Sequence, residues 1–344
     1  MRVLLVKMSS LGDVVHVLPA ITDAAAHGIR FDWVVEEAYA DIARRHSAVA
    51  NVLPIGWRRW RHSLRASRGE LTAFISRLRT EHYDLVLDAQ GLIKSGVLAG
   101  LARGSAKAGF AQRSAREAAA AVFYERRIPI PRNQHAIDRL RQLFGLALGY
   151  RCTGEIDFGI APVAADIEPA QCVLLHGTTW ASKHYPEIMW IELARQAISR
   201  GLQVAVPWGD EIEKARAERI ATAAGATVWE RTTIAQLMDR LGRSALAVGV
   251  DSGLAHLSAA LNVPTVVIYG STDAALTGCR GARVVNVQAE FPCAPCVLRD
   301  CTYSGDDHEW QGDAVRPPCY SRIAPEAVWK AATEVMNADR VLSI

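Results

Sequence analysis

A carboxylate, two hydroxyls and a glycine lie close together near the amino terminus, in the stretch MSSLGD at positions 8–13. A dinucleotide-binding loop would need three glycines here, and Gly12 is the only one, so binding of NAD or FAD is disfavoured. Asp13 has two interpretations. It can cap the helix that we expect to begin at Val14, or it can act as a general base at the floor of a cleft.

A second polar segment, GTTWASKHYP at positions 177–186, follows an apolar run in the second half of the chain. It holds the hydroxyls of Thr178 and Thr179 and one amine, Lys183. Free backbone N–H groups and a helix dipole at such a turn favour an anionic phosphate group. The alternative is an ordinary turn with Lys183 in solvent.

A third segment strengthens the phosphate hypothesis. The apolar run Leu246–Val250 ends in Asp251-Ser252-Gly253, and His256 falls in the first turn of the helix that follows. Two such loops at neighbouring strand ends predict a diphosphate site. His256 alone would more often be a structural histidine.

Between these two loops, PWG at positions 207–209 ends another predicted strand, and Glu213 lies on the next helix. An acidic residue at this place can accept hydrogen bonds from both ribose hydroxyls of a nucleotide. The alternative is one charge on a mixed-charge helix face spanning residues 211–219.

Arginines alternate with aromatic residues in WRRWRH at positions 57–62, with Arg65 and Arg68 behind them. Residues 1–150 carry 22 Lys and Arg against 13 Asp and Glu, whereas the remainder carries 17 against 23. Arginine forks bind phosphate and carboxylate in bidentate fashion, so an anionic glycolipid suits this half. A simple solvated face is the alternative. Nucleic acid is disfavoured, because the net charge is only +3.

Four cysteines follow the spacing C-x2-C-x4-C-x17-C, with His308 inside the array. The members are Cys293, Cys296, Cys301 and Cys319. Thiolates at this density can hold zinc, although the spacing matches no common zinc finger. Free or paired thiols are the other interpretation, and an odd total of seven cysteines argues against a disulfide framework.

The elements that must position these groups form two α/β series. Strands are predicted at 2–7, 31–35, 52–55, 85–88 and 106–110, and then at 172–176, 203–207, 246–250 and 265–269. Two Rossmann-like domains are expected, residues 1–160 and 161–323, with parallel sheets facing a central cleft. Residues 151–170 suit a linker, the alanines at 118–121 a helix, and 324–344 a helix that returns to the first domain.

The bulk properties fit a protein of the cytosol. Half of the residues are apolar and 22% are charged. The amino terminus lacks the apolar core of a secretory signal, and no stretch approaches 18 apolar residues. We therefore expect a cytoplasmic monomer whose contact with a membrane is peripheral.

Several stretches together resemble the lipopolysaccharide heptosyltransferases of glycosyltransferase family 9. They lie in the family's order over residues 1 to about 275 and read VKMSSLGDVVHVLPA, FDWVVEE, LVLDAQGLIKSG, HGTTWASKHYP, PWG and VGVDSGLAHLSAAL. The resemblance implies the GT-B fold and metal-independent, cofactor-free inverting transfer of heptose. The donor would be ADP-heptose, and the acceptor the sugar Kdo of Kdo-lipid A at the inner membrane.

The resemblance also implies roles for residues. Asp13 would be the base and Lys183 would stabilise the leaving diphosphate. Donor binding would fall to Thr178, Thr179, Glu213, Asp251, Ser252, Gly253 and His256. Acceptor binding would fall to Ser10, Arg58, Arg59, Arg61 and Arg116.

Two other functions remain open from the sequence. The cysteine array is more like that of family members that act on a later core acceptor, so the acceptor is less certain than the chemistry. A sugar-nucleotide epimerase also uses two Rossmann-like domains, but it would leave the basic, aromatic segment 57–62 without a role.

Overall fold

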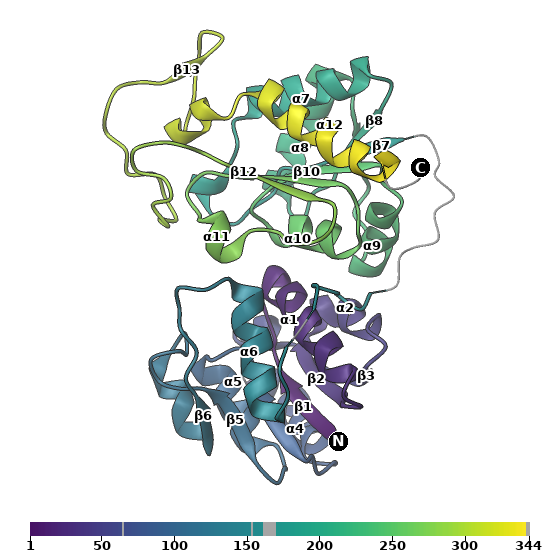
Figure 1. Ribbon diagram of the computed structural model, residues 1–344, viewed down its shortest axis with the longest axis vertical. Coiled ribbons are helices and arrows are strands. Elements are labelled where there is room, and N and C mark those ends of the chain that lie inside the picture. Colours follow the sequence, from purple (N-terminus) through teal and green to yellow (C-terminus); the bar gives the residue numbers. More distant parts are fainter. Residues whose placement is uncertain (64, 153, 161–169, 342–344) are drawn as a thin grey trace. The chain divides into compact units, whose positions relative to one another are not determined.

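The computed structural model describes residues 1–63, 65–152, 154–160 and 170–341 (Figure 1). The chain divides into two compact units, Met1–Ala161 and Pro162–Ile344, beside the expected boundary after residue 160. Within the predicted linker 151–170, residues 153 and 161–169 lie outside the described residues, as do residues 342–344 of the predicted terminal helix.

The first unit is built on a parallel sheet in the order β3-β2-β1-β4-β5-β6. Its strands are β1 (Arg2–Val6), β2 (Arg30–Glu36), β3 (Val49–Ile55), β4 (Leu85–Asp88), β5 (Lys107–Phe110) and β6 (Arg126–Ile128). The order reverses between β1 and β4, which pair directly. Such a reversal opens a crevice at the carboxyl ends of the two strands.

Helices cover both faces of this sheet. They are α1 (Leu11–Ala25), η1 (Glu37–Tyr39), α2 (Ala40–Arg44), α3 (Trp57–Trp60), α4 (Arg68–Leu78), α5 (Ile93–Leu101), η2 (Ala118–Phe123) and α6 (Ala136–Leu148). Phe74 of α4 and Leu98 of α5 pack with Leu4, Val34 and Val86 of the sheet in one buried cluster. Alternate strand residues therefore face these helices, as the period of two requires.

The second unit repeats this topology, with the order β12-β11-β10-β7-β8-β9. Its strands are β7 (Gln171–Leu175), β8 (Gln203–Val206), β9 (Thr227–Val228), β10 (Leu246–Val250), β11 (Thr265–Tyr269) and β12 (Val284–Gln288), with a small hairpin of β13 (Glu309–Trp310) and β14 (Asp313–Ala314). Its helices are η3 (Ala181–Lys183), α7 (Glu187–Ser199), α8 (Glu211–Ala224), α9 (Ile234–Gly242), α10 (Gly253–Ala260), α11 (Ala274–Thr277), η4 (Pro318–Arg322) and α12 (Pro325–Val341).

All nine strands predicted from the sequence form, and both sheets are parallel. Three strands, β6, β9 and β12, were not predicted from the sequence, and all three are edge strands. Edge strands can be short and partly exposed, so their apolar pattern is weak. The alanines at 118–121 lie in the 3-10 helix η2. Among the described residues, no helix combines the length and apolarity needed to cross a membrane.

The terminal helix α12 packs on the second unit. Val328, Ala332 and Val335 belong to the same buried cluster as Leu193 of α7 and Val266 of β11. The expectation that this helix returns to the first domain is therefore wrong for its described side chains. An amphipathic pattern shows that a helix has an apolar face, but it does not show which surface buries that face.

Candidate functional site

Asp13 lies in the first turn of α1, immediately after the loop that leaves β1. Its carboxylate accepts a hydrogen bond from the backbone N–H of Ser10 at 2.9 Å. Lys7 Nζ lies 3.1 Å from Oδ1, and Arg116 donates through both terminal nitrogens, at 3.0 and 3.2 Å. Asp13 thus helps to cap α1, but from its third position: the helix begins at Leu11 rather than at Val14, and Ser10 is the N-cap. Two cations meet the same carboxylate.

Burial opposes the charge of Asp13, but Lys7 and Arg116 outweigh it. The net result is a pKa well below the usual range, with a contribution from the Ser10 N–H group. Burial lowers the pKa of Lys7, although Asp13 works in the opposite direction. The Asp13 side chain is therefore an ionised carboxylate at neutral pH, and this is the form that can take a proton.

Gln90, in the loop after β4, holds the Asp13 loop in place. Its side-chain oxygen accepts from the backbone N–H groups of Met8 at 2.7 Å and Ser9 at 3.2 Å. Its own backbone N–H donates to Asp88. Gln90 lies within the stretch LVLDAQGLIKSG, but no role was predicted for it from the sequence. Adjacency of β1 and β4 is what brings it to the loop.

The four arginines predicted to bind an acceptor have different partners in the structure. The guanidinium of Arg58 lies 5.2 Å from the ring centre of Tyr39. Arg59 is engaged by Glu37 and Glu70. Arg61 is exposed at the end of α3. Of the four predicted arginines, Arg116 is the one hydrogen-bonded to Asp13.

In the second unit, Lys183 and Asp251 meet although they lie 68 residues apart. Lys183 Nζ is 2.6 Å from Asp251 Oδ2, and it also lies 4.5 Å from the ring centre of Trp180. The Thr178 hydroxyl donates to the backbone carbonyl of Asp251 at 3.4 Å. The loops meet because β7 and β10 are neighbours in the sheet.

His256 joins the same cluster from α10. Its Nε2 lies 3.5 Å from Asp251 Oδ1, and its Nδ1 lies 3.1 Å from the Cys279 sulfur. Burial opposes protonation of His256, but Cys279 and Asp251 raise its pKa to about 10. Burial alone would raise the pKa of Asp251. The hydrogen bond and charge of His256 and the charge of Lys183 outweigh burial, so the pKa of Asp251 is lowered.

The remaining predicted donor residues lie on the same loops. Ser252 caps α10 by accepting from the backbone of Ala255, Gly253 is the first residue of that helix, and Thr179 is exposed. Glu213 accepts from the Gly209 backbone at 2.7 Å, and burial raises its pKa. These loops follow β7, β8 and β10, which are consecutive in the sheet.

Two residues that the sequence analysis did not select support this cluster. Thr272 donates to Asp251 Oδ2 at 2.7 Å. Ser182, next to Lys183, is hydrogen-bonded to Ser271 at 3.0 Å and to the carbonyl of Leu298. The sequence contains a pattern that could have predicted a role for Thr272, because GSTD at 270–273 follows an apolar strand, as the other polar loops do.

All seven cysteines lie in the described residues, and none forms a disulfide. Cys293 and Cys301 are exposed, while Cys319 is buried. In the described ranges, no group of three or more His, Cys, Asp or Glu side chains is placed to hold a metal ion.

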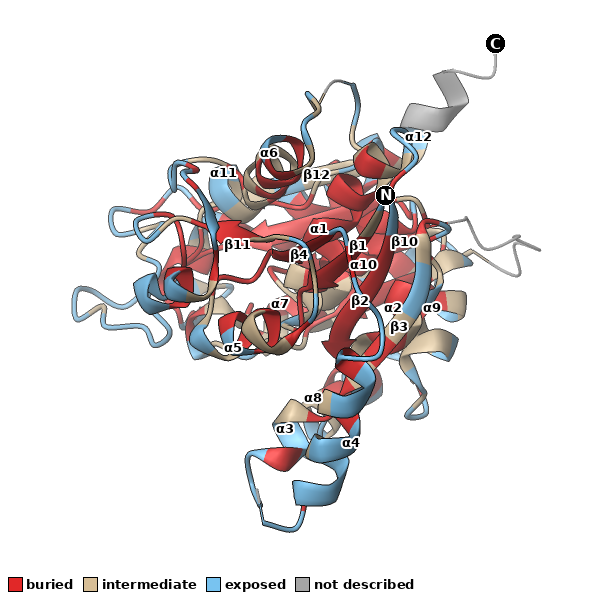
Figure 2. Cartoon of the chain, turned by 90° about the horizontal axis from the view of Figure 1, so that it is seen from below, coloured by how far each residue is buried: buried red, intermediate tan, exposed pale blue. Residues whose placement is uncertain are grey.

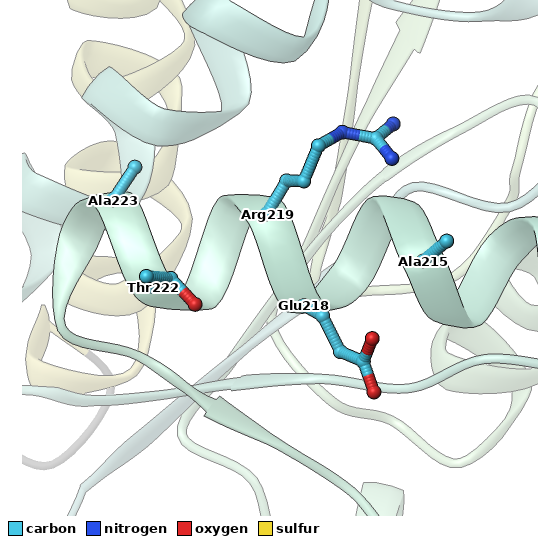
Figure 3. A pocket seen from close by; sticks show the side chains of 5 residues that line it. All are labelled: Ala215, Glu218, Arg219, Thr222 and Ala223. Atoms are coloured by element: carbon cyan, nitrogen blue, oxygen red, sulfur yellow. The ribbon is translucent and has the colours of Figure 1, made fainter.

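A depression lies along α8 (Figure 3). Its lining comes from one helix and consists of Ala215, Glu218, Arg219, Thr222 and Ala223. Both Arg219 guanidinium hydrogen bonds go to Glu187, at 2.7 and 2.8 Å. Since its only cation is already paired, the depression is not a candidate for an anionic ligand.

Residues 71–305 match the family described as "Glycosyltransferase family 9 (heptosyltransferase)". Lipopolysaccharide heptosyltransferase 1 of Pseudomonas aeruginosa is 44% identical over 340 residues, which cover 95% of this chain and 96% of that protein. The same enzyme of Salmonella typhimurium is 42% identical over 288 residues, covering 81% and 91%.

The solved structure of Escherichia coli heptosyltransferase WaaC with ADP superposes with a TM-score of 0.83. It is 37% identical and covers 97% of this chain and all of that one. A second WaaC structure, with ADP-2-deoxy-2-fluoro heptose, has a TM-score of 0.79 at 36% identity.

Two parallel six-stranded Rossmann-like sheets that match this structure define the chain as a glycosyltransferase of the GT-B class. More narrowly, the chain belongs to glycosyltransferase family 9, the heptosyltransferases. The epimerase alternative is thereby set aside, because the enzyme class is a transferase.

Proposed function

We propose that the enzyme transfers heptose from ADP-heptose to a Kdo sugar of Kdo-lipid A, with inversion at the anomeric carbon. The observation that carries the proposal is likeness over nearly the whole chain to lipopolysaccharide heptosyltransferase 1, together with likeness to WaaC structures that hold ADP and a fluoro-heptose derivative. Because its acceptor is a lipid, the enzyme would work as a peripheral protein on the cytoplasmic face of the inner membrane.

Asp13 is the proposed base. Inversion by one displacement needs a group that removes the acceptor proton as the hydroxyl attacks the anomeric carbon. Asp13 is an ionised carboxylate at the end of β1, and Gln90 fixes its loop. The carboxylate would take the proton of the acceptor hydroxyl, whose oxygen would form the new bond to the anomeric carbon as the bond to ADP breaks.

The leaving group is ADP, whose diphosphate gains negative charge as the glycosidic bond breaks. Lys183 is the proposed counter-charge, and the N-terminus of α10 and the hydroxyls of Thr178 and Thr179 would supply hydrogen bonds. In the described structure Lys183 is paired with Asp251 at 2.6 Å. Binding of the diphosphate would therefore share or replace that ion pair, leaving Asp251 to accept from sugar hydroxyls.

Glu213 is the proposed partner of the ribose hydroxyls. Its carboxylate is held at the end of β8 by the Gly209 N–H group. Gly177 lies opposite, where an added Cβ would lie 2.5 Å from Glu213 Oε1, so the carboxylate can occupy this position because residue 177 has no side chain. A later core acceptor is the less favoured function, because a lipooligosaccharide heptosyltransferase 2, that of Haemophilus influenzae, matches only 27% of this chain, at 29% identity.

The test replaces Asp13 by Asn and measures ADP release that depends on Kdo-lipid A. We expect turnover to fall by about 10²- to 10⁴-fold while the affinity for ADP-heptose, measured by calorimetry, changes little. Asp41→Asn, on the exposed surface of α2, is the matched control and should keep full activity.

Three results would contradict the proposal. Full turnover of Asp13→Asn would remove the base assignment. Donor consumption without any acceptor would argue against transfer. Stronger binding of a UDP-sugar or GDP-sugar than of ADP-heptose would overturn the donor assignment.

A further inference from the structure

Three large apolar side chains are exposed together on the first unit. Ile93 is 46% exposed, Val97 39% and Val122 65%. Ile93 and Val97 are four residues apart on α5, so they share one face of the helix. Val122 lies on η2, which packs along α5. We name these three residues the apolar ridge.

Glycines explain why η2 lies so close to α5. A Cβ added at Gly96 would lie 2.7 Å from the Phe123 ring, and one added at Gly100 would lie 3.1 Å from it. On a helix of 3.6 residues per turn, Gly96 and Gly100 adjoin the face of Ile93 and Val97. Phe123 packs against this side of α5, so its exposed neighbour Val122 lies on the element that adjoins the helix.

Cations border the ridge. Burial is the main reason that the pKa of Lys94 is lowered, and Arg58 and Arg61 lower it further, whereas Glu36 and Glu117 raise it. Lys94 follows Ile93 on α5 and therefore adjoins the ridge, and Arg58 and Arg61 are among the charges that act on it. Helix α3 is partly exposed in Figure 2: Arg58 and Arg61, the residue that follows the helix, are exposed, whereas Trp60 is buried. The surface thus combines apolar and cationic groups.

The ridge is connected to Asp13. Glu117 accepts a hydrogen bond from the Ile93 backbone at 2.7 Å, which fixes the start of α5 beside the loop before η2. The preceding residue, Arg116, is hydrogen-bonded to Asp13. One short segment therefore joins the start of the ridge to the carboxylate assigned as base.

We propose that the apolar ridge, together with Lys94 and the neighbouring arginines, docks the enzyme on the surface of an anionic lipid bilayer that carries the acceptor. This inference rests on the proposed function for its biological meaning. Apolar side chains that enter the headgroup region and cations that meet anionic lipids are the two contributions that give reversible interfacial binding. The sugar of a lipid acceptor would then reach Asp13 while its acyl chains stay in the bilayer.

The experiment measures co-sedimentation of the purified protein with phosphatidylglycerol vesicles and with phosphatidylcholine vesicles. We expect preferential binding to phosphatidylglycerol that weakens with added salt. The triple variant Ile93→Gln, Val97→Gln, Val122→Gln should bind about tenfold or more weakly, and Lys94→Gln several-fold more weakly. The matched control is Leu146→Gln with Ile212→Gln, two exposed apolar residues elsewhere. This control should bind as the unmodified protein does.

Equal vesicle binding by the triple variant and the unmodified protein would overturn the proposal, as would an equal loss in the control. So would a concentration-dependent dimer that the triple variant abolishes while vesicle binding is absent, because the ridge would then belong to a second copy. Thermal unfolding of each variant shows whether its fold is intact.

Turnover separates this inference from the proposed function. The triple variant should lose activity toward the lipid acceptor in vesicles and keep it toward a deacylated, water-soluble acceptor. Full activity of the variant in vesicles would overturn the docking surface and leave the transferase proposal standing. If the unmodified protein modifies neither acceptor but its vesicle binding still depends on the ridge, the function fails and the surface stands.

Discussion

The Asp13 carboxylate lies between two cations that differ in how far they are buried. Asp13 is held by Lys7, whose side chain is 4% exposed, and by Arg116, whose side chain is 58% exposed. A buried lysine cannot leave its partner without a large cost in desolvation, whereas an exposed arginine can. Arg116 is therefore the cation that an incoming anionic acceptor can draw away from Asp13.

Replacing Arg116 by Gln should change the pH dependence of turnover. The carboxylate must be ionised to act as a base, so activity is lost as pH falls through its pKa. Loss of one cation raises that pKa towards its ordinary value, and the acidic limb of kcat/KM moves to higher pH. Arg113→Gln, an exposed arginine of the same loop, is the control. An acidic limb that stays in place would contradict this account.

His256 should affect stability in a pH window that its raised pKa defines. A group whose pKa is raised on folding stabilises the fold fully below its unfolded value of 6.5, and this contribution is lost as pH rises towards about 10. The difference in Tm between the protein and His256→Gln should therefore be larger at about pH 6 than at about pH 9.5.

The control for this measurement is His62→Gln, an exposed histidine of the first unit. Its difference in Tm should stay small and should not follow the same window. A His256→Gln difference that grows with pH would show that the imidazole is neutral in the folded protein.

At the scale of elements, the loops after β7, β8 and β10 form one polar surface because these strands are neighbours. Close approach between loops depends on glycine at two places. Gly177 faces Glu213 with space for no side chain, and an added Cβ at Gly209 would lie 3.1 Å from the same carboxylate. The helix α8 is thereby positioned against the loop that follows β7.

Gly177→Ala should displace Glu213 and weaken binding of ADP, because the new Cβ would lie 2.5 Å from Oε1. We expect a loss on the order of 1–3 kcal/mol, because a hydrogen-bonding group of the nucleotide site would be displaced. Isothermal calorimetry with ADP measures it. Gly69→Ala in α4, where an added Cβ meets nothing within 4 Å, is the control and should bind ADP normally. Unchanged affinity in Gly177→Ala would remove Glu213 from the nucleotide site.

At the scale of the whole molecule, each unit has its own core and its own polar surface at the carboxyl ends of its strands. The residues assigned to the donor all belong to the second unit, and those assigned to the acceptor all belong to the first. The charge asymmetry follows the same division, since the basic half is the one expected to meet an anionic lipid.

Hydrogen exchange with saturating ADP should therefore show protection concentrated in the second unit. We expect slower exchange in the loops at 177–183, 209–213 and 251–256, because bound ligand suppresses local opening. The loop at 8–13 in the same sample is the internal control. Protection of that loop without any at 177–183 would contradict the division of substrates between the units.

The sequence alone determined the parallel α/β class, nine of the strands and the polar loops that carry Asp13, Lys183 and Asp251. Each of these signals is local: an apolar run of strand length followed by glycine, hydroxyl and charged residues. Three kinds of information were not local. The pairing of Lys183 with Asp251 depends on which strands are neighbours, the contact of Arg116 with Asp13 joins residues 103 positions apart, and the surface that buries α12 depends on complementary packing. Only the tertiary structure decides these, because burial and ion pairing are properties of residues brought together from distant parts of the chain.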